Sequence, residues 1–358
     1  MIQKVESLMA RQPCCAAGGG SDLCGHNWLM HFRVPRYNSS LYLFLLLAAF
    51  TAWHADAAQP DSIDGEIEKL ETGSPIDQQA AMASLAKRGP GASSPLLVVI
   101  KGGHDRMARV RATKVLKSIL KSSPQAGEVI LGDLEKMATD SDTAVADAGI
   151  TLATEVRSAR AIKLIRTAAK NHPNDIVRGK ALTSLLVASG RGKSEGDSFA
   201  AALKDKSEFV QLRAASALGS VGRKDGLPVC IEILQREPTR KNWSLMIEAA
   251  EALGEIGDRS AIPALEKVAK SDTYGPAMGR AKIAIQSIRL AGLNDGAARL
   301  ALLRESLRQI PLASWAAYQL KALGSAEALD ALRQAAAEVA NPAQSDVQRV
   351  LRQITDEH

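Results

Sequence analysis

The sequence predicts an all-α protein built as an α-solenoid (superhelix) of about eight stacked helix pairs. Similar segments recur about every 31 to 36 residues, and each reads as a helix, a glycine-containing turn and a second helix. Aromatic residues make up only 4% of the chain, whereas alanine and leucine recur throughout it. Small side chains let helices approach closely over many similar contacts, as a stack of repeats requires.

The N-terminal part of the chain has the pattern of a secretory signal. Residues 41–53, LYLFLLLAAFTAW, form an uncharged apolar run that follows Arg33 and Arg36 and precedes small residues around Ala57. The run is shorter than the roughly 20 residues that cross a bilayer as a helix, which favours cleavage after Ala57 or Ala58.

We therefore expect a presequence over residues 1–57 and a mature chain from residue 58. Residues 1–29 read as a misassigned upstream start, and residues 30–57 have the proportions of a signal peptide. The expected location is the periplasm of a Gram-negative bacterium, with no stable membrane insertion after cleavage. An N-terminally membrane-anchored protein is the alternative.

The clearest repeats are residues 210–234, VQLRAASALGSVGRKDGLPVCIEIL, and residues 246–270, MIEAAEALGEIGDRSAIPALEKVAK. Leu218 and Leu253 occupy equivalent positions in their first helices, on an apolar face that the second helix is expected to cover. The equivalent positions elsewhere are Leu85, Leu116, Leu152, Leu185, Ile285 and Leu320. A lone pair would leave an apolar face uncovered, so the pairs are expected to stack.

Glycine, proline and capping residues indicate where the helices start and end. Glycines are expected to terminate the first helices, and prolines to open the second helices, where a missing N–H costs little. These residues are Gly219, Gly222, Gly254 and Gly257, then Pro228 and Pro263. Asp61 or Ser62 can open a first capping helix and Ser345 a last one. The prediction is a single solenoid over residues 58–358 with helical caps.

Segments such as residues 210–234 resemble HEAT repeats of the kind found in phycobilisome-lyase-like proteins. The resemblance implies an α-solenoid and, for function, a scaffold, regulatory subunit, transport adaptor or, in a minority, a lyase. Family members often place an aspartate near an arginine on the first helix. Asp205 with Arg213 and Asp175 with Arg178 match that pattern loosely, and we interpret them as structural.

No catalytic or metal-binding pattern emerges. Residues 187–194, VASGRGKS, match only the end of a phosphate-binding loop, because Val187 replaces its first glycine and no strand precedes it. His104, His172 and His358 are too scattered for a zinc site, and no GxSxG motif is present. We expect no catalytic residues, no metal and no cofactor, so that the chain is not an enzyme.

The remaining candidates for a functional site are charged residues on the surface. The second helices conventionally line the concave side of such solenoids, and basic side chains recur on them. The candidate partner-binding residues are Lys163, Arg166, Lys170, Lys204, Arg236, Lys267 and Lys270, with Trp243 as an exposed aromatic. Solvated helix faces are the alternative interpretation of these lysines and arginines.

The expected function is an exported scaffold or adaptor in the cell envelope that binds another protein or peptide, an acidic one if these charges form a groove. The alternative is a bilin-lyase-type enzyme or chaperone-like lyase subunit. No nucleic-acid partner is expected, because the chain lacks a concentrated basic patch with aromatic residues nearby.

Overall fold

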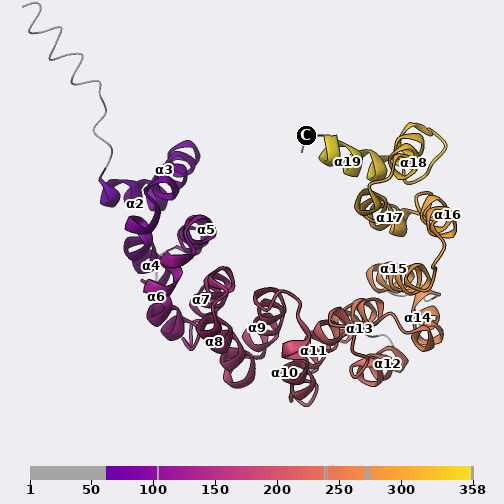
Figure 1. Ribbon diagram of the computed structural model, residues 1–358, viewed down its shortest axis with the longest axis horizontal. Helices are drawn as coiled ribbons and strands as arrows, with labels where there is room; N and C mark the ends of the chain where they lie inside the picture. Colours follow the sequence, from indigo (N-terminus) through magenta and orange to yellow (C-terminus); the bar gives the residue numbers. More distant parts are fainter. Residues whose placement is uncertain (1–61, 103–104, 238, 240, 271–274, 356–358) are drawn as a thin grey trace, which may run out of the picture. The chain divides into compact units, whose positions relative to one another are not determined.

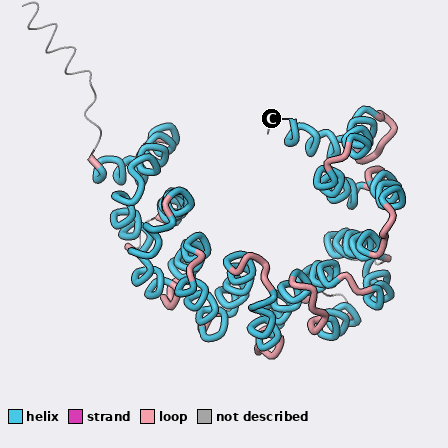
Figure 2. Tube along the Cα trace, in the orientation of Figure 1, coloured by secondary structure: helices cyan, strands magenta, loops and turns pink. Residues whose placement is uncertain are grey.

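The computed structural model describes residues 62–102, 105–237, 239, 241–270 and 275–355. Helices and loops account for all of this described part, as the prediction of an all-α chain requires (Figure 2). Helix follows helix in pairs along the sequence (Figure 1). Over the described residues, eight such pairs lie between a first and a last single helix, which confirms the predicted solenoid.

The first helix of each pair carries the repeated leucine or isoleucine of the sequence pattern. These first helices are α3 (Pro75–Arg88), α5 (Arg106–Ser122), α7 (Thr143–Val156), α9 (Asp175–Ala188), α11 (Glu208–Ser220), α13 (Trp243–Ile256), α15 (Gly275–Ala291) and α17 (Ile310–Leu323).

The second helices are in general shorter. They are α4 (Ser93–Lys101), α6 (Pro124–Met137), α8 (Ala159–Asn171), α10 (Gly196–Ala202), α12 (Leu227–Gln235), α14 (Ile262–Ala269), α16 (Gly296–Ser306) and α18 (Ala326–Ala337). The single helices at the two ends are α2 (Ile63–Thr72) and α19 (Gln344–Thr355). Pro228 and Pro263 occupy the first turns of α12 and α14, as predicted.

The helices form two layers. Each first helix packs against the first helix of the next pair, from α3 through to α17, and α17 packs in turn against α19. Each second helix packs against the first helix that follows it, as α4 does with α5 and α8 with α9. In Figure 1 the first helices lie along one side of the array and the second helices along the other. Every repeat is thus stabilised mainly by its neighbours.

Three consecutive first helices begin at side chains that cap their free amides. Asp105 accepts hydrogen bonds from two backbone N–H groups of α5, and Asp142 accepts one from α7. Asn174 accepts two from the start of α9. Such caps satisfy donors that have no partner inside the helix, and they fix where the helix starts.

Two of the glycines assigned to helix ends have another role. Gly222 and Gly257 do have positive φ angles, of 78° and 71°, and they follow the first helices as predicted. Gly219 and Gly254, in contrast, lie inside α11 and α13. A Cβ on Gly219 would come within 2.6 Å of the backbone nitrogen of Ile256, so this glycine lets two first helices approach closely.

The ends of the array agree in part with the sequence pattern. Ser62 caps α2 by accepting a hydrogen bond from the backbone of Gly65, as predicted. The prediction that Ser345 caps the last helix is wrong by two residues, because α19 begins at Gln344 and is preceded by Ala343. The carbonyl of Ala343 accepts the first helical hydrogen bond, from the amide of Val347.

Several of the ion pairs join neighbouring repeats. The guanidinium of Arg178 donates to both carboxylate oxygens of Asp205 at 2.8 Å and to the carbonyls of His172 and Pro173. From the sequence, Arg178 was paired with Asp175 and Arg213 with Asp205, each within one repeat. In the structure each arginine binds a carboxylate of the next repeat. Arg213 instead binds Glu248 of the next first helix at 2.7 Å.

The signal-peptide and anchor predictions fall on residues 1–57, which lie outside the described residues. Among the helices that are described, none combines the length and the apolar character needed to cross a membrane.

Candidate functional site

Three of the residues that the sequence nominated lie together. Arg166, Lys170 and Lys204 line a hollow of about 530 Å³ formed by α8, α9 and the end of α10. Arg166 is already engaged, because its guanidinium binds the buried carboxylate of Glu195 at 2.6 Å. That hydrogen bond holds the pKa of Glu195 below its ordinary value, although burial acts in the opposite direction. Arg166 is therefore part of the packing between repeats.

The other nominated residues are spread over the second-helix layer. Lys163 lines a separate hollow, of about 430 Å³, on the α6 side of α8. Three others bind carboxylates of this chain: Arg236 binds Glu208 and Glu232, Lys267 binds Glu237, and Lys270 lies 3.9 Å from Glu266. Trp243 is the first residue of α13 and is exposed. The structure does not bring the eight residues into one groove.

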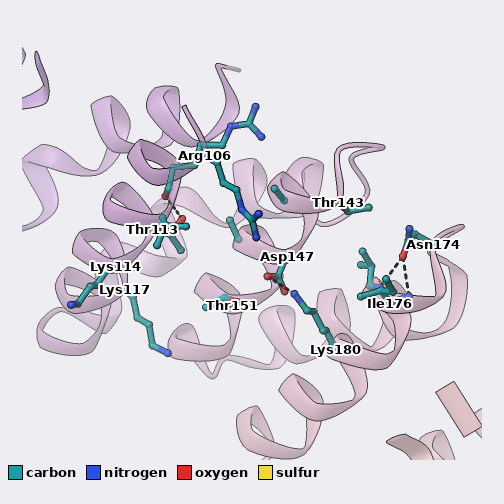
Figure 3. Close-up of a pocket in the computed structure, with 15 residues that line it drawn as sticks. Arg106, Thr113, Lys114, Lys117, Thr143, Asp147, Thr151, Asn174, Ile176 and Lys180 are labelled. Atoms are coloured by element: carbon teal, nitrogen blue, oxygen red, sulfur yellow. Dashed lines mark hydrogen bonds and ion pairs between the residues drawn. The ribbon is translucent and has the colours of Figure 1, made fainter. Parts of the chain in front are cut away.

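A different surface is hollowed on the first-helix layer. Residues of α5, α7 and α9 line a groove of about 820 Å³, which we call the first-helix groove (Figure 3). Its lining is Arg106, Arg109, Val110, Thr113, Lys114, Lys117, Thr143, Ala144, Asp147, Ala148, Thr151, Asn174, Ile176, Val177 and Lys180.

The two walls of the first-helix groove repeat one arrangement. On α5, Val110 and Lys114 are four residues apart, and on α9 the same spacing separates Ile176 from Lys180, so each pair lies on one helix face. Val110 is 51% exposed and Ile176 is 54% exposed. Between the walls, α7 contributes small residues, among them Ala144 and Ala148. Each wall thus presents one exposed apolar residue and, one turn farther along the helix, a lysine.

Each of three cations in the groove is held by a carboxylate of the α7 repeat. Arg109 binds Asp142 at 2.6 Å, Lys117 binds Glu155 at 3.2 Å, and Lys180 binds Asp147 at 2.8 Å. The bond from Arg109 also lowers the pKa of the Asp142 carboxyl below its ordinary value, so this carboxylate stays ionised at neutral pH.

The positions of these pairs also show how the helices are oriented. Arg109 and Lys117 reach the start and the end of α7 respectively, which shows that α5 and α7 run parallel. The remaining cations, Arg106 and Lys114, form no ion pair with a described carboxylate. Five cations line the groove against one lining carboxylate, Asp147, so the lining is basic, although the carboxylates of Asp105 and Asp142 cap the N-termini of α5 and α7 at one end.

This site was not predicted from the sequence, because the expected binding charges were those of the second helices alone. A signal was available, since Val110 and Ile176 lie beside the buried stripe of their helices, which Val115 and Leu116 represent on α5. In each of two nearby repeats, an apolar residue outside the buried face is followed four residues later by a lysine. Such a recurrence predicts that the two helices contribute to one surface.

Comparison with known proteins agrees with the fold. A family model described as HEAT repeats matches residues 196–286, which span α10 to most of α15. No curated protein sequence matches the chain.

Several solved structures are similar in fold. YibA of Escherichia coli is 21% identical over 65% of this chain and 82% of its own, with a TM-score of 0.41. The CpcE–CpcF complex of phycocyanin lyase from Nostoc is 15% identical over 68% of this chain and 92% of the other, with a TM-score of 0.40. Kap121p bound to Pho4p is 15% identical over 82% of this chain and 37% of the other, with a TM-score of 0.49.

Identities and TM-scores this low say nothing about what this chain binds or catalyses. The fold itself is clear from the helix pairs and from the matched segment. The chain is an α-solenoid of helix pairs, and residues 196–286 match the family model of HEAT repeats.

Proposed function

We propose that this chain is a non-catalytic adaptor that binds another protein through the first-helix groove, and that it does so in the cell envelope after export. The observation that carries the proposal is the matched pair of walls, Val110 with Lys114 and Ile176 with Lys180, on either side of the small residues of α7. The two apolar side chains share one hollow with basic groups, and an apolar patch rimmed by polar residues fits a surface that a partner covers.

The charge of the groove supports a partner of acidic character. Arg106 and Lys114 lack a carboxylate partner among the described residues, so a binding protein could supply one without displacing an existing ion pair. Export is supported only by the apolar run over residues 41–53, which lies outside the described part of the chain.

The test compares two double variants of the full-length protein in affinity capture from envelope fractions. Val110→Glu with Ile176→Glu places two charges on the groove walls. Val98→Glu with Val129→Glu makes the same change on exposed residues of the second helices α4 and α6. All four sites are exposed, so both variants should remain folded, as far-UV circular dichroism can verify.

The proposal predicts that the groove variant loses its captured partner, whereas the control variant retains it. Equal capture by both variants would show that binding uses another surface. Loss of capture by the control alone would move the binding site to the second-helix layer.

A further inference from the structure

A second candidate site is the hollow formed by α8, α9 and the end of α10, which Arg166, Lys170 and Lys204 help to line. We propose that this hollow binds a small organic anion with an apolar body, such as a carboxylate or sulfonate on a ring or a hydrocarbon chain. The inference goes beyond the proposed function and does not depend on it, because none of these three residues lines the first-helix groove.

The hollow has the size and the inner surface of a small-ligand site. Its volume is about 530 Å³, within the range of about 300–1,000 Å³ that is usual for such sites. Leu182 and Leu185 of α9 line it and are almost fully buried in the array. Three small apolar residues of α8 and α10 complete this part of the lining: Ala169, Ala201 and Ala202. An apolar body placed in the hollow would therefore exchange water for apolar surface.

The apolar part of this lining is recessed. Among the described lining residues, the large apolar ones are Leu182 and Leu185, and neither is exposed. In the first-helix groove, by contrast, Val110 and Ile176 are about half exposed and can meet a protein surface. A small molecule can enter a recess that the surface of a folded protein does not reach, so the hollow favours a small ligand.

Three of the five charged residues that line the hollow are already paired within the chain. The pairs are Arg166 with Glu195, Asp205 with Arg178, and Asp197 with Arg223, at 2.6, 2.8 and 2.9 Å respectively. Each lining carboxylate thus has an arginine partner that lies outside the lining. A ligand does not need to neutralise either of them.

The two remaining charges of the lining are both positive. Lys170 of α8 and Lys204, in the turn after α10, form no ion pair with a described carboxylate. Both lysines are exposed, and long lysine side chains usually keep their ammonium group in water. An anionic group at the rim could bind these ammonium groups without displacing an existing ion pair, while the apolar body covers the leucines. A neutral molecule of the same shape would lack this attraction.

The experiment uses two fluorescent probes that have the same rings and differ in charge. The anionic probe is 8-anilinonaphthalene-1-sulfonate, and the neutral probe is N-phenyl-1-naphthylamine, which lacks the sulfonate. Each probe is titrated into the full-length protein at low salt, and its rise in fluorescence gives a dissociation constant. Low salt is needed because exposed charges are otherwise screened.

The test variant is Lys170→Met with Lys204→Met, which removes both charges and keeps two long side chains. It should bind the anionic probe about three- to tenfold more weakly, as expected for two exposed charge contacts. Its binding of the neutral probe should stay within about twofold of the unmodified protein. The matched control, Lys136→Met with Lys206→Met, removes the same charge at exposed lysines outside this lining and should bind both probes normally.

A second variant adds charge to the hollow instead of removing it. Ala201→Glu places a carboxylate in the lining at an exposed position of α10, where it should leave the fold intact. It should weaken the anionic probe at least threefold and leave the neutral probe within about twofold. Octanoate should also displace the anionic probe from the unmodified protein at lower concentration than octan-1-ol, which has the same chain without the charge.

The opposite results would overturn the inference. They are unchanged binding of the anionic probe by the Lys170 and Lys204 variant, equal weakening of both probes, or no binding of either probe to the unmodified protein. The proposed function is tested separately, because envelope capture that depends on Val110 and Ile176 would stand whichever result the probes give.

Discussion

Removing the guanidinium of Arg178 should destabilise the solenoid more than removing any exposed arginine. Its side chain is 4% exposed and that of Asp205 is 14% exposed. Arg178→Ala removes two hydrogen bonds to the carboxylate of Asp205 and two to the carbonyls of His172 and Pro173. It leaves a largely buried carboxylate without its cation.

The cost follows from that burial. Removing one partner of a buried ion pair typically costs about 3–5 kcal/mol, because the remaining charge stays uncompensated in a poorly solvated site. We expect a decrease of this size in the free energy of unfolding for Arg178→Ala. The matched control is Arg160→Ala, because Arg160 binds Glu135 through the same two-bond geometry, at 2.9 Å each, on an exposed surface. Water screens that pair, so its loss should matter far less.

Urea unfolding followed by circular dichroism at 222 nm measures both variants against the unmodified protein. If Arg178→Ala lowers stability no more than Arg160→Ala does, burial is not what makes this ion pair important, and the reasoning fails.

The effect should also depend on pH. The hydrogen bonds from Arg178 lower the pKa of Asp205 in the folded protein. The stabilisation is therefore complete above the unfolded pKa of about 3.9 and is lost as the pH falls through the lower, folded value. The difference in stability between the unmodified protein and Arg178→Ala should shrink below about pH 4.

Three further predictions concern packing. Gly219→Ala should cost about 1–3 kcal/mol in urea unfolding, because its Cβ would meet the backbone of α13, whereas Gly132→Ala, with open space around it, should stabilise by up to about 1 kcal/mol. Cys230 should react with thiol reagents at pH 8 only after unfolding, since burial raises the pKa of its thiol to about 12; rapid labelling of the native protein would contradict this. Leu218→Asp should cause severe loss of helical signal because that side chain is fully buried, whereas deletion of residues 208–242 should leave a shorter folded array.

The repeat pattern made most of the fold predictable. Leu218 and Leu253 are both fully buried, each on the first helix where the pattern placed them. Such periodicity reports which face of a helix is buried, and a stack of similar pairs then follows from covering that face. Contacts between repeats were less predictable, because the partner of Arg178 depends on the rise and rotation from one pair to the next, which no local pattern encodes.

The candidate site, like the fold, was only partly predictable from the sequence. Sequence alone could mark Lys163 and Arg166 as basic, but not that Glu195 already neutralises Arg166. For this reason, reversing the charge of Arg166 would disturb packing as well as any binding. Likewise, Val110 and Ile176 belong to one groove only because α5 and α9 flank α7.

Binding through the first-helix groove is tested most directly by site-specific photo-crosslinking of the partner in envelope fractions. A benzophenone amino acid is placed singly at Val110, at Ile176 or, on the second-helix layer, at Lys170. Binding through the first-helix groove predicts partner adducts at the first two positions and none at the third. Adducts at Lys170 alone would contradict the account and return the binding site to the second helices.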